Sequence, residues 1–145
     1  MPVRRQLSRF AAGEGGCRGG GEIFVLSIAL TVLLLLEVLP SAGAQLGRFE
    51  VGLKRLDELT RLGLADGRHL WVLPALGTVH LIGGAAVIVG IWLPAVGVAG
   101  AALEAAVFGW VLFRQLRAGD RGGALFAYSL FTSMALAVLV VDALR

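Results

Sequence analysis

Residues 70–116 read LWVLPALGTVHLIGGAAVIVGIWLPAVGVAGAALEAAVFGWVLFRQL, and this stretch decides the fold of the chain. It contains two apolar runs, Leu70–Leu93 and Val96–Leu116, which are separated by a short turn at Pro94. Each run comes close to the roughly 20 residues that a helix needs to cross the hydrocarbon core of a bilayer. The short turn predicts that the two helices are antiparallel neighbours.

Two further apolar runs flank this pair, at Ile23–Leu46 and at Ala124–Val141. The composition agrees with four membrane spans, because 57% of the 145 residues are hydrophobic and only 16% are charged. A backbone in lipid has to satisfy its own hydrogen bonds, so the runs are expected to be helices rather than strands. The predicted fold class is therefore all-α: a membrane four-helix bundle in a multi-pass protein, with an amphipathic helix in the first loop.

The first span contains Pro40, which either ends the helix or bends it. Continuation to Leu46 is favoured, because Ile23–Leu39 alone is short for a crossing and membrane helices tolerate proline. The run is too long for a signal peptide and lacks a small-residue cleavage site, which predicts a retained span. Residues 1–22 are predicted to be a disordered, Gly- and Arg-containing tail, and residues 23–145 one membrane domain.

The segment Arg48–Leu64 has a different character, because charged residues alternate with apolar ones at helical spacing. It is predicted to be an amphipathic helix along the membrane surface that stops near Gly63, with an ordinary soluble connector helix as the alternative. Favourable charge pairs four residues apart support the helix. The pairs are Glu50 with Lys54 and Asp57 with Arg61, and the apolar stripe consists of Phe49, Leu53, Leu56 and Leu59.

The chain carries 13 Lys and Arg against 10 Asp and Glu, a formal net charge of +3. In a membrane protein such an excess reflects topology and lipid headgroups, so nucleic acid is not an expected partner. With four spans, both termini lie on one side of the membrane and the two polar inter-helix loops on the other. The loops carry more arginine and lysine than the tails, so the positive-inside rule favours a cytoplasmic position for the loops.

Three ionisable residues fall inside the predicted spans: Glu37, His80 and Glu104. A rise of about 1.5 Å per residue places them about 21, 15 and 12 Å into the membrane, so all three share its middle band. Charged groups at that depth are costly and usually face the bundle interior. The three side chains are therefore predicted to form an intramembrane polar cluster, with a direct His80–Glu104 hydrogen bond between neighbouring helices.

Small residues near this cluster favour close helix contact. Gly77 and Gly83 share a face with His80 on the second span, and a Gly/Ala stripe flanks Glu104 on the third. A buried Glu–His pair can carry a proton or bind a ligand, and it can equally fix the helix register without a further role. Hydroxyl residues on the last span are more typical of helix packing than of a site. They are Ser129, Thr132 and Ser133.

No catalytic motif is present, and the sequence leaves open whether the chain is an enzyme. Cys17 is the single cysteine, so neither an intrachain disulfide nor a Cys-x-x-Cys redox motif can form. His69 and His80 lie about 16 Å apart by helical rise, which prevents both from binding one haem. Ligands at suitable spacing for a metal are missing as well, so no metal and no cofactor are expected.

Residues 76–120 combine a Gly/Ala-rich helix, a tight proline turn and a third helix that ends in LRAGD. Together with SAGAQL at residues 41–46 and RLGLADG at residues 61–67, this pattern resembles the DoxX-like family of small four-helix integral membrane proteins. The resemblance implies a four-helix bundle in the plasma membrane. Some members of that family are associated with membrane redox complexes of quinones, thiols or sulfur compounds. The family often has Lys, Glu and His where this chain has Gln45, His80 and Gln115.

Three functions agree with these features. The first is an accessory subunit associated with membrane redox systems, which would co-purify with a quinone-linked or thiol-redox partner. The second is a small proton-coupled membrane transporter that uses the intramembrane Glu/His cluster. The third is a structural assembly protein whose glycine stripes bind partner helices. The expected partners are the lipid bilayer and either a membrane redox complex or further copies of the chain.

Overall fold

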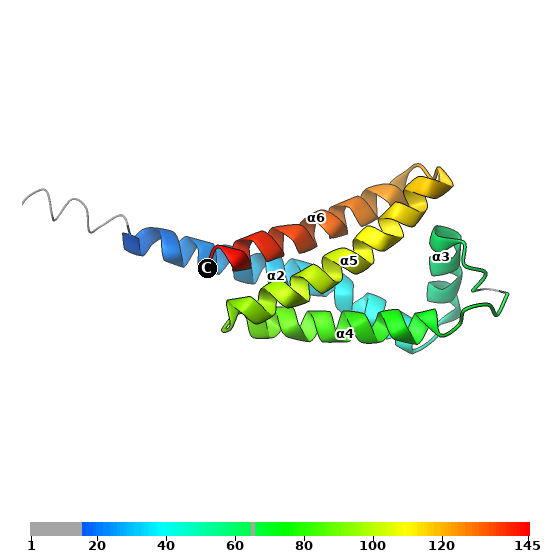
Figure 1. The fold of residues 1–145 in the computed structure, drawn as a ribbon, viewed down its shortest axis with the longest axis horizontal. Coiled ribbons are helices and arrows are strands. Elements are labelled where there is room, and N and C mark those ends of the chain that lie inside the picture. Colours follow the sequence, from blue (N-terminus) through cyan, green and yellow to red (C-terminus); the bar gives the residue numbers. More distant parts are fainter. Residues whose placement is uncertain (1–15, 65) are drawn as a thin grey trace, which may run out of the picture.

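The computed structural model describes residues 16–64 and 66–145, and the expected tail over residues 1–15 lies outside them. The described residues form five helices joined by short connections (Figure 1). The predicted all-α fold, with four long helices and one short helix in the first loop, is confirmed. The helices are α2 (Gly16–Leu46), α3 (Glu50–Thr60), α4 (Val72–Gly90), α5 (Pro94–Ala118) and α6 (Gly123–Ala143).

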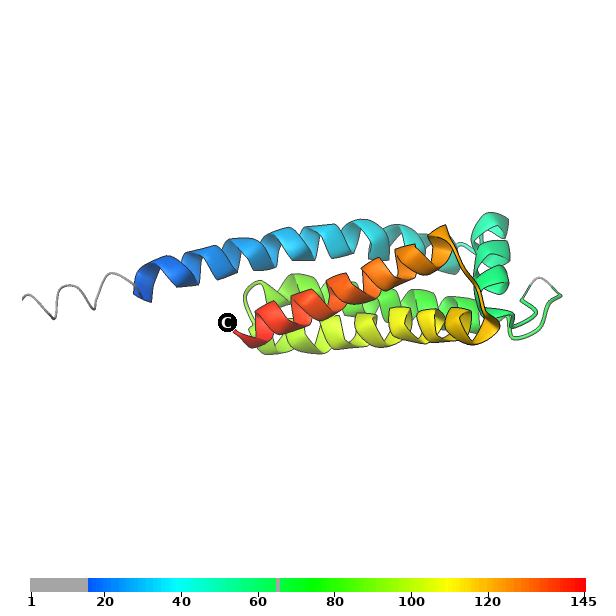
Figure 2. The ribbon, with the colours of Figure 1, turned by 90° about the horizontal axis from the view of Figure 1, so that it is seen from above.

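Four of these helices, α2 from Gly21 onward, α4, α5 and α6, are long and apolar enough to cross a membrane. The chain is therefore a multi-pass membrane protein. Figure 2 shows the four helices side by side, with the start of α2 and the C-terminus toward one end and α3 with the longer loops at the other. Gly16 and Arg145 thus lie toward the same end of the bundle, as four alternating crossings require.

Helix α2 is longer than the sequence predicts at its N-terminal end. It begins at Gly16, so residues 16–22, which the sequence places in the tail, belong to the helix. The predicted continuation through Pro40 is correct, because α2 runs without interruption to Leu46. With 31 residues, α2 is about 46 Å long, which exceeds the roughly 30 Å hydrocarbon core.

The hairpin of α4 and α5 is held by glycines at the points of closest approach. A Cβ added at Gly90 would collide with the Cα of Gly97, and one added at Gly100 would lie 2.7 Å from the carbonyl oxygen of Gly83. Only residues without a side chain permit this backbone distance. Pro94 occupies the first position of α5, where its missing N–H has no helical partner to lose. The tight antiparallel hairpin predicted from residues 70–116 is confirmed.

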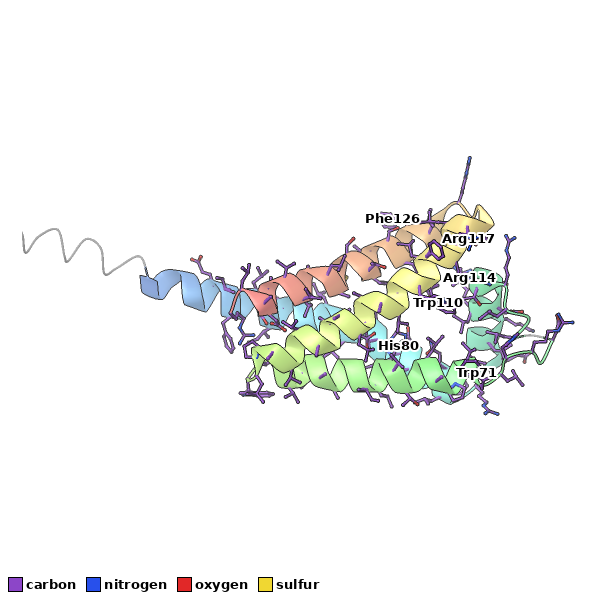
Figure 3. The ribbon with its side chains drawn as sticks, in the orientation of Figure 1. Trp71, His80, Trp110, Arg114, Arg117 and Phe126 are labelled. Atoms are coloured by element: carbon purple, nitrogen blue, oxygen red, sulfur yellow. The ribbon has the colours of Figure 1, made fainter. Side chains whose placement is uncertain are left out.

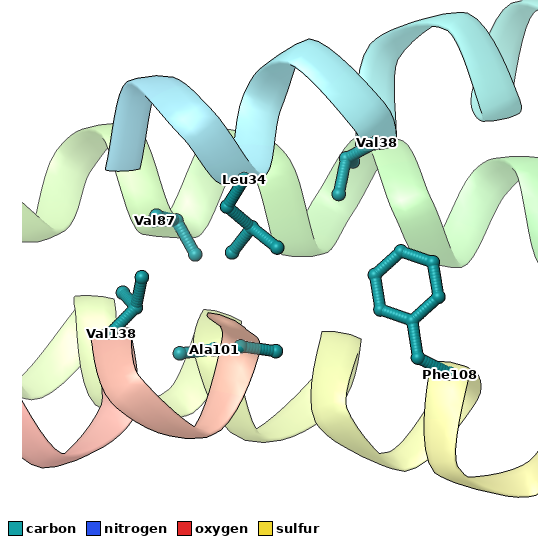
Figure 4. Close-up of a cluster of buried hydrophobic side chains, with 7 residues drawn as sticks. Leu34, Val38, Val87, Ala101, Phe108 and Val138 are labelled. Carbon is teal, nitrogen blue, oxygen red and sulfur yellow. The ribbon is translucent and has the colours of Figure 1, made fainter. Parts of the chain in front are cut away.

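The core of the bundle consists of small, branched and aromatic side chains from all four long helices (Figure 4). Its buried members are Leu34, Val38, Val87, Ala101, Phe108, Ala135 and Val138. Larger apolar side chains point outward instead, as Leu36 and Phe126 do with 68% and 72% of their surface exposed. An exposed apolar face on a membrane-spanning helix lies against lipid. Small side chains inside the bundle and large apolar side chains on its surface are therefore expected.

Helix α3 lies across the end of the bundle, transverse to the long helices (Figures 1 and 2). Its apolar stripe packs on protein, because Leu56 is buried in a small cluster with Leu64 and Leu73. The helix is shorter than the predicted Arg48–Leu64: it ends at Thr60, where Arg61 adopts a left-handed conformation with φ of 53°. A location at the membrane surface agrees with this transverse position and remains a prediction.

Candidate functional site

The predicted hydrogen bond between His80 and Glu104 is present. His80 on α4 and Glu104 on α5 approach to 2.6 Å between Nδ1 and Oε2, and their side chains are 3% and 0% exposed. Because α4 and α5 are antiparallel neighbours, the two residues reach the same level of the bundle. A hydrogen bond between ionisable groups at this depth offsets part of the cost of their burial.

The second carboxylate oxygen of Glu104 has a different environment. Oε1 is buried and has no hydrogen-bond partner among the residues that the structure describes. It rests against Gly83 of α4, where an added Cβ would collide with it. Gly83 therefore makes room for the carboxyl group, and the unbonded oxygen leaves a position where the carboxyl group can hold a proton.

Aromatic rings close the pair on the side of α6. The imidazole of His80 lies 5.2 Å from the ring of Phe108, centroid to centroid (Figure 3 places His80 within the bundle). Phe108 in turn contacts Tyr128 and Phe131 of α6 at 6.3 and 5.7 Å. This aromatic group lowers the local polarity around His80 and restricts the access of water to it. The sequence analysis did not anticipate it, although Phe108 lies one turn after Glu104.

Glu37, the third predicted member, belongs to the neighbourhood of the pair without bonding to it. It lies on α2 within electrostatic range of His80. Its half-buried side chain lines a cavity of about 310 Å³ between α2, α3 and α6. The other polar residues of this cavity are Ser41, Gln45, Arg55 and Tyr128. The structure thus brings all three predicted residues into one region, with Glu37 on a cavity wall and the other two inside the bundle.

A second buried polar cluster, which the sequence analysis missed, lies at the opposite end from α3. The hydroxyl group of Ser27 donates a hydrogen bond to Asp142 Oδ1 at 2.7 Å, and Arg145 Nη1 donates to the Ser27 oxygen at 2.8 Å. Arg145 also bonds the carbonyl oxygen of Ile91 at 2.8 Å. Asp142 is only 2% exposed, and its Oδ2 rests against Gly97.

The sequence contains only a weak indication of this cluster. The apolar run of the last span ends at Val141, so Asp142 reads as the first residue beyond the membrane. Its partner Ser27 is 115 positions away and looks like an ordinary polar residue in an apolar run. An acidic residue directly after a span, followed three positions later by an arginine, is the one local pattern that indicates it.

The hydroxyl groups of α6 are satisfied by their own helix. Ser129, Thr132 and Ser133 each donate to the carbonyl oxygen four residues earlier, at 2.7 to 2.8 Å. This back-bonding agrees with the packing interpretation. His69 contacts the carbonyl oxygen of Leu62 in the loop before α4. Within residues 16–64 and 66–145, no group of three or more His, Cys, Asp or Glu side chains has the arrangement of a metal site.

The stretch with the DoxX-like pattern, residues 76–120, folds as most of α4, the proline turn and all of α5. Two of the positions at which the chain differs from the family pattern, Gln45 and Gln115, have buried amide oxygen atoms without a partner in the described part of the chain. Comparisons of the chain with protein-family models, with curated proteins and with solved structures give no match.

Proposed function

We propose that the chain is a DoxX-like accessory subunit of the plasma membrane, which accompanies a redox complex of quinones, thiols or sulfur compounds instead of carrying out a reaction alone. The observation that supports an accessory role is the enclosure of the His80–Glu104 pair, whose residues are 2% and 0% exposed. Neither residue lines the cavity beside Glu37. A pair this deeply buried is better placed to fix the register of α4 against α5 than to meet a substrate.

The association with redox chemistry rests on the sequence pattern of residues 76–120. That pattern coincides with the α4–α5 hairpin, the element on which α2 and α6 pack. The exposed apolar side chains of α2 and α6, among them Leu36 and Phe126, provide faces for partner helices as well as for lipid.

The test is purification of the tagged full-length chain from its native membrane in a mild detergent. We expect an enzyme with quinone-linked or thiol-redox activity to co-purify in a fixed ratio. Glu104→Gln is the matched variant, because it keeps the volume of the side chain and removes its charge. An accessory role predicts an intact complex with unchanged activity in Glu104→Gln. A chain that purifies without a redox enzyme, or an intact Glu104→Gln complex without activity, contradicts the proposal.

A small proton-coupled transporter is the second candidate, and one observation favours it. Glu37 on the wall of the 310 Å³ cavity lies within electrostatic range of His80, which is bonded to Glu104. Three ionisable groups therefore lead from a cavity into the middle of the bundle, an arrangement typical of proton relays.

Liposomes that contain the purified chain and a trapped pH indicator distinguish the two functions. A transporter loses proton flux in Glu37→Gln and keeps it in Glu58→Gln, which alters an exposed carboxylate on α3. An accessory subunit gives the same background flux for the wild type and both variants.

A further inference from the structure

We propose that the α3 end of the bundle binds an anionic phospholipid, with its phosphate held by Arg61, Arg114 and Arg117 and one acyl chain in an apolar groove beside Trp110. This inference is independent of the function proposed above, because it concerns a different part of the molecule. It rests on two adjacent cavities, one basic and one apolar.

The basic cavity has a volume of about 210 Å³ and lies between α3 and the last turns of α5. Guanidinium groups dominate its lining, which consists of Thr60, Arg61, Arg114, Arg117 and Ala118. A guanidinium group presents its N–H donors in a planar fork that matches the oxygen atoms of a phosphate. Several such groups around one cavity make phosphate the ligand of choice.

The three arginines are held in place, and an ion pair with a carboxylate is seen for Arg61. Arg114 donates from Nε and Nη2 to the carbonyl oxygen of Thr60, at 3.2 and 2.6 Å, and its other N–H groups stay available. Arg61 bonds Asp120 at 3.1 Å. Arg117 lies over the ring of Phe113 at 5.6 Å, and its guanidinium group has no hydrogen bond within residues 16–64 and 66–145. Among the residues that the structure describes, the lining of this cavity contains three guanidinium groups and no carboxylate, which makes the site positive.

The apolar cavity has a volume of about 420 Å³ and lies between the loop before α4, the first turns of α4 and Trp110 of α5. Leu62, Trp71, Leu76, Val79 and Trp110 are among the residues that line it. Trp71 directly precedes α4 and is 68% exposed, as is typical of tryptophan at the boundary between headgroups and hydrocarbon. On the surface of a membrane-spanning helix pair, a groove of this kind accommodates an acyl chain.

The two cavities meet along one face of α5. Trp110, Arg114 and Arg117 are spaced four and then three residues apart, so they share a stripe of the helix that rises about 10 Å. Figure 3 shows them in succession toward the end that α3 crosses, with Trp71 at the start of α4. On the α3 side, Arg61 lines the basic cavity and the next residue, Leu62, lines the apolar one. A phospholipid has the same order, with a charged phosphate directly above an apolar chain.

Charge complementarity selects an anionic lipid over a zwitterionic one, since the site carries an excess of positive charge. This end of the bundle, which comprises α3, its flanking loops, the last turns of α5 and the loop to α6, also holds 8 of the 13 arginine and lysine residues, which favours the cytoplasmic leaflet. That leaflet is where anionic lipids accumulate at basic juxtamembrane residues.

The experiment uses the full chain in detergent with three additions: phosphatidylglycerol, phosphatidylcholine or inorganic phosphate. Native mass spectrometry counts bound lipid, and quenching of tryptophan fluorescence by brominated chains reports the groove. We expect phosphatidylglycerol to bind most tightly and Arg117→Gln to weaken it roughly fivefold. Arg121→Gln, which removes an exposed arginine from the neighbouring loop, is the matched control and leaves the affinity unchanged. Equal affinities for the two lipids, or equal losses in the two variants, overturn the proposal.

The apolar half of the site has its own pair of variants. Trp110→Ala lowers both the affinity for phosphatidylglycerol and the quenching, whereas Trp92→Ala, at the far end of α4, lowers the affinity little. Inorganic phosphate that displaces the lipid completely at low millimolar concentration contradicts a role for the groove. Arg117→Lys covers the case in which Arg117→Gln does not fold, because it keeps the charge. It must retain a salt-sensitive preference for phosphatidylglycerol.

Discussion

Two buried carboxyl groups, Glu104 in the middle of the bundle and Asp142 at its end, are alike in geometry and differ in their partners. Each has one bonded oxygen and one oxygen that rests against a glycine, Gly83 for Glu104 and Gly97 for Asp142. Glu104 shares its hydrogen bond with a histidine that is as buried as itself. Asp142 has a serine and Arg145, and the side chain of Arg145 is still 13% exposed.

The partner decides what each carboxyl group can do. Arginine stays protonated at any accessible pH, so Asp142 sits beside a permanent positive charge and fixes the ends of α2 and α6. Histidine changes charge near neutral pH. A single proton in the Glu104–His80 pair can reside on either group, and the pair has no net charge in both cases. The cluster of Asp142, Ser27 and Arg145 thus holds α2 and α6 together through a fixed charge, while the His80–Glu104 pair can redistribute a proton.

The largest effect is expected from the glycine that faces Asp142. A Cβ in Gly97→Ala would meet both the carboxyl group of Asp142 and the backbone of Gly90, 2.9 Å from its Cα, so α4 and α5 have to separate. We expect a loss of about 3 kcal/mol in the free energy of unfolding, measured by titration with denaturing detergent in mixed micelles.

Gly83→Ala is the control, because the three atoms nearest to its Cβ all belong to the side chain of Glu104 and none to the backbone. A loss of about 1 kcal/mol is expected there. Equal losses of stability in the two variants would show that the close backbone contact at Gly97 does not make this position more sensitive than Gly83.

The second-largest loss of stability is expected from removal of the Arg145 charge. Arg145→Ala removes the cation beside Asp142 and should cost about 2 kcal/mol, between the values typical of a broken buried ion pair and of a polar contact in a membrane. Adding Asp142→Asn to this variant should recover part of the loss, because the uncompensated carboxylate is then gone. A double variant that is less stable than Arg145→Ala would argue against an ion pair.

For the central pair, the hydrogen bond of the imidazole is expected to respond more than stability. Glu104→Gln should cost only about 1 kcal/mol, since a glutamine oxygen can still accept from the imidazole. The nitrogen NMR signals of the His80 ring, which report the hydrogen bond at Nδ1, should shift clearly in the same variant. Identical nitrogen spectra of the wild type and Glu104→Gln would mean that the two side chains do not share this hydrogen bond.

The smallest effect belongs to an exposed pair on α3, which serves as the reference for both buried ones. The hydrogen bond from Lys54, at 2.8 Å, and its charge hold the pKa of Glu50 below the usual 4.5. Because the pKa is lower in the folded state, this pair stabilises α3 above about pH 4.5 and ceases to do so as the pH falls through the lowered value. Lys54→Gln should return the pKa of Glu50 toward 4.5 in a carboxyl-carbon NMR titration, with no measurable change in stability. An unchanged pKa would show that the ion pair is not populated in solution.

The four spans and the central pair were accessible from the sequence because each depends on local periodicity. Apolar runs of sufficient length specify membrane helices, and a tight turn fixes which helices are neighbours. The approach of His80 to Glu104 then follows from counting residues along an antiparallel hairpin. Glu37 could be assigned only a depth, since its rotation about α2 depends on contacts with α6.

The remaining features depend on distant contacts or on backbone detail. Ser27 lies 115 positions before Asp142, and no spacing rule connects these two residues; only Asp142 and Arg145, three positions apart, are linked by local spacing. The early end of α3 comes from the left-handed conformation of Arg61, a residue that carries no glycine signal. The extension of α2 to Gly16 was missed because its first turns are rich in glycine, which helices usually disfavour.

The glycine contacts between α4 and α5 also bear on how the protein enters the membrane during synthesis. These two helices meet through close backbone contacts and through the His80–Glu104 hydrogen bond, so they can leave the translocon as a preformed hairpin before α6 has been made. A lone charged side chain at the centre of a nascent span opposes insertion by about 2.5–3.5 kcal/mol. Within the hairpin, Glu104 and His80 arrive together and neutralise one another. Asp142 has no companion within its own stretch of apolar residues, so its carboxyl group is bonded to Ser27 only once α6 packs against α2.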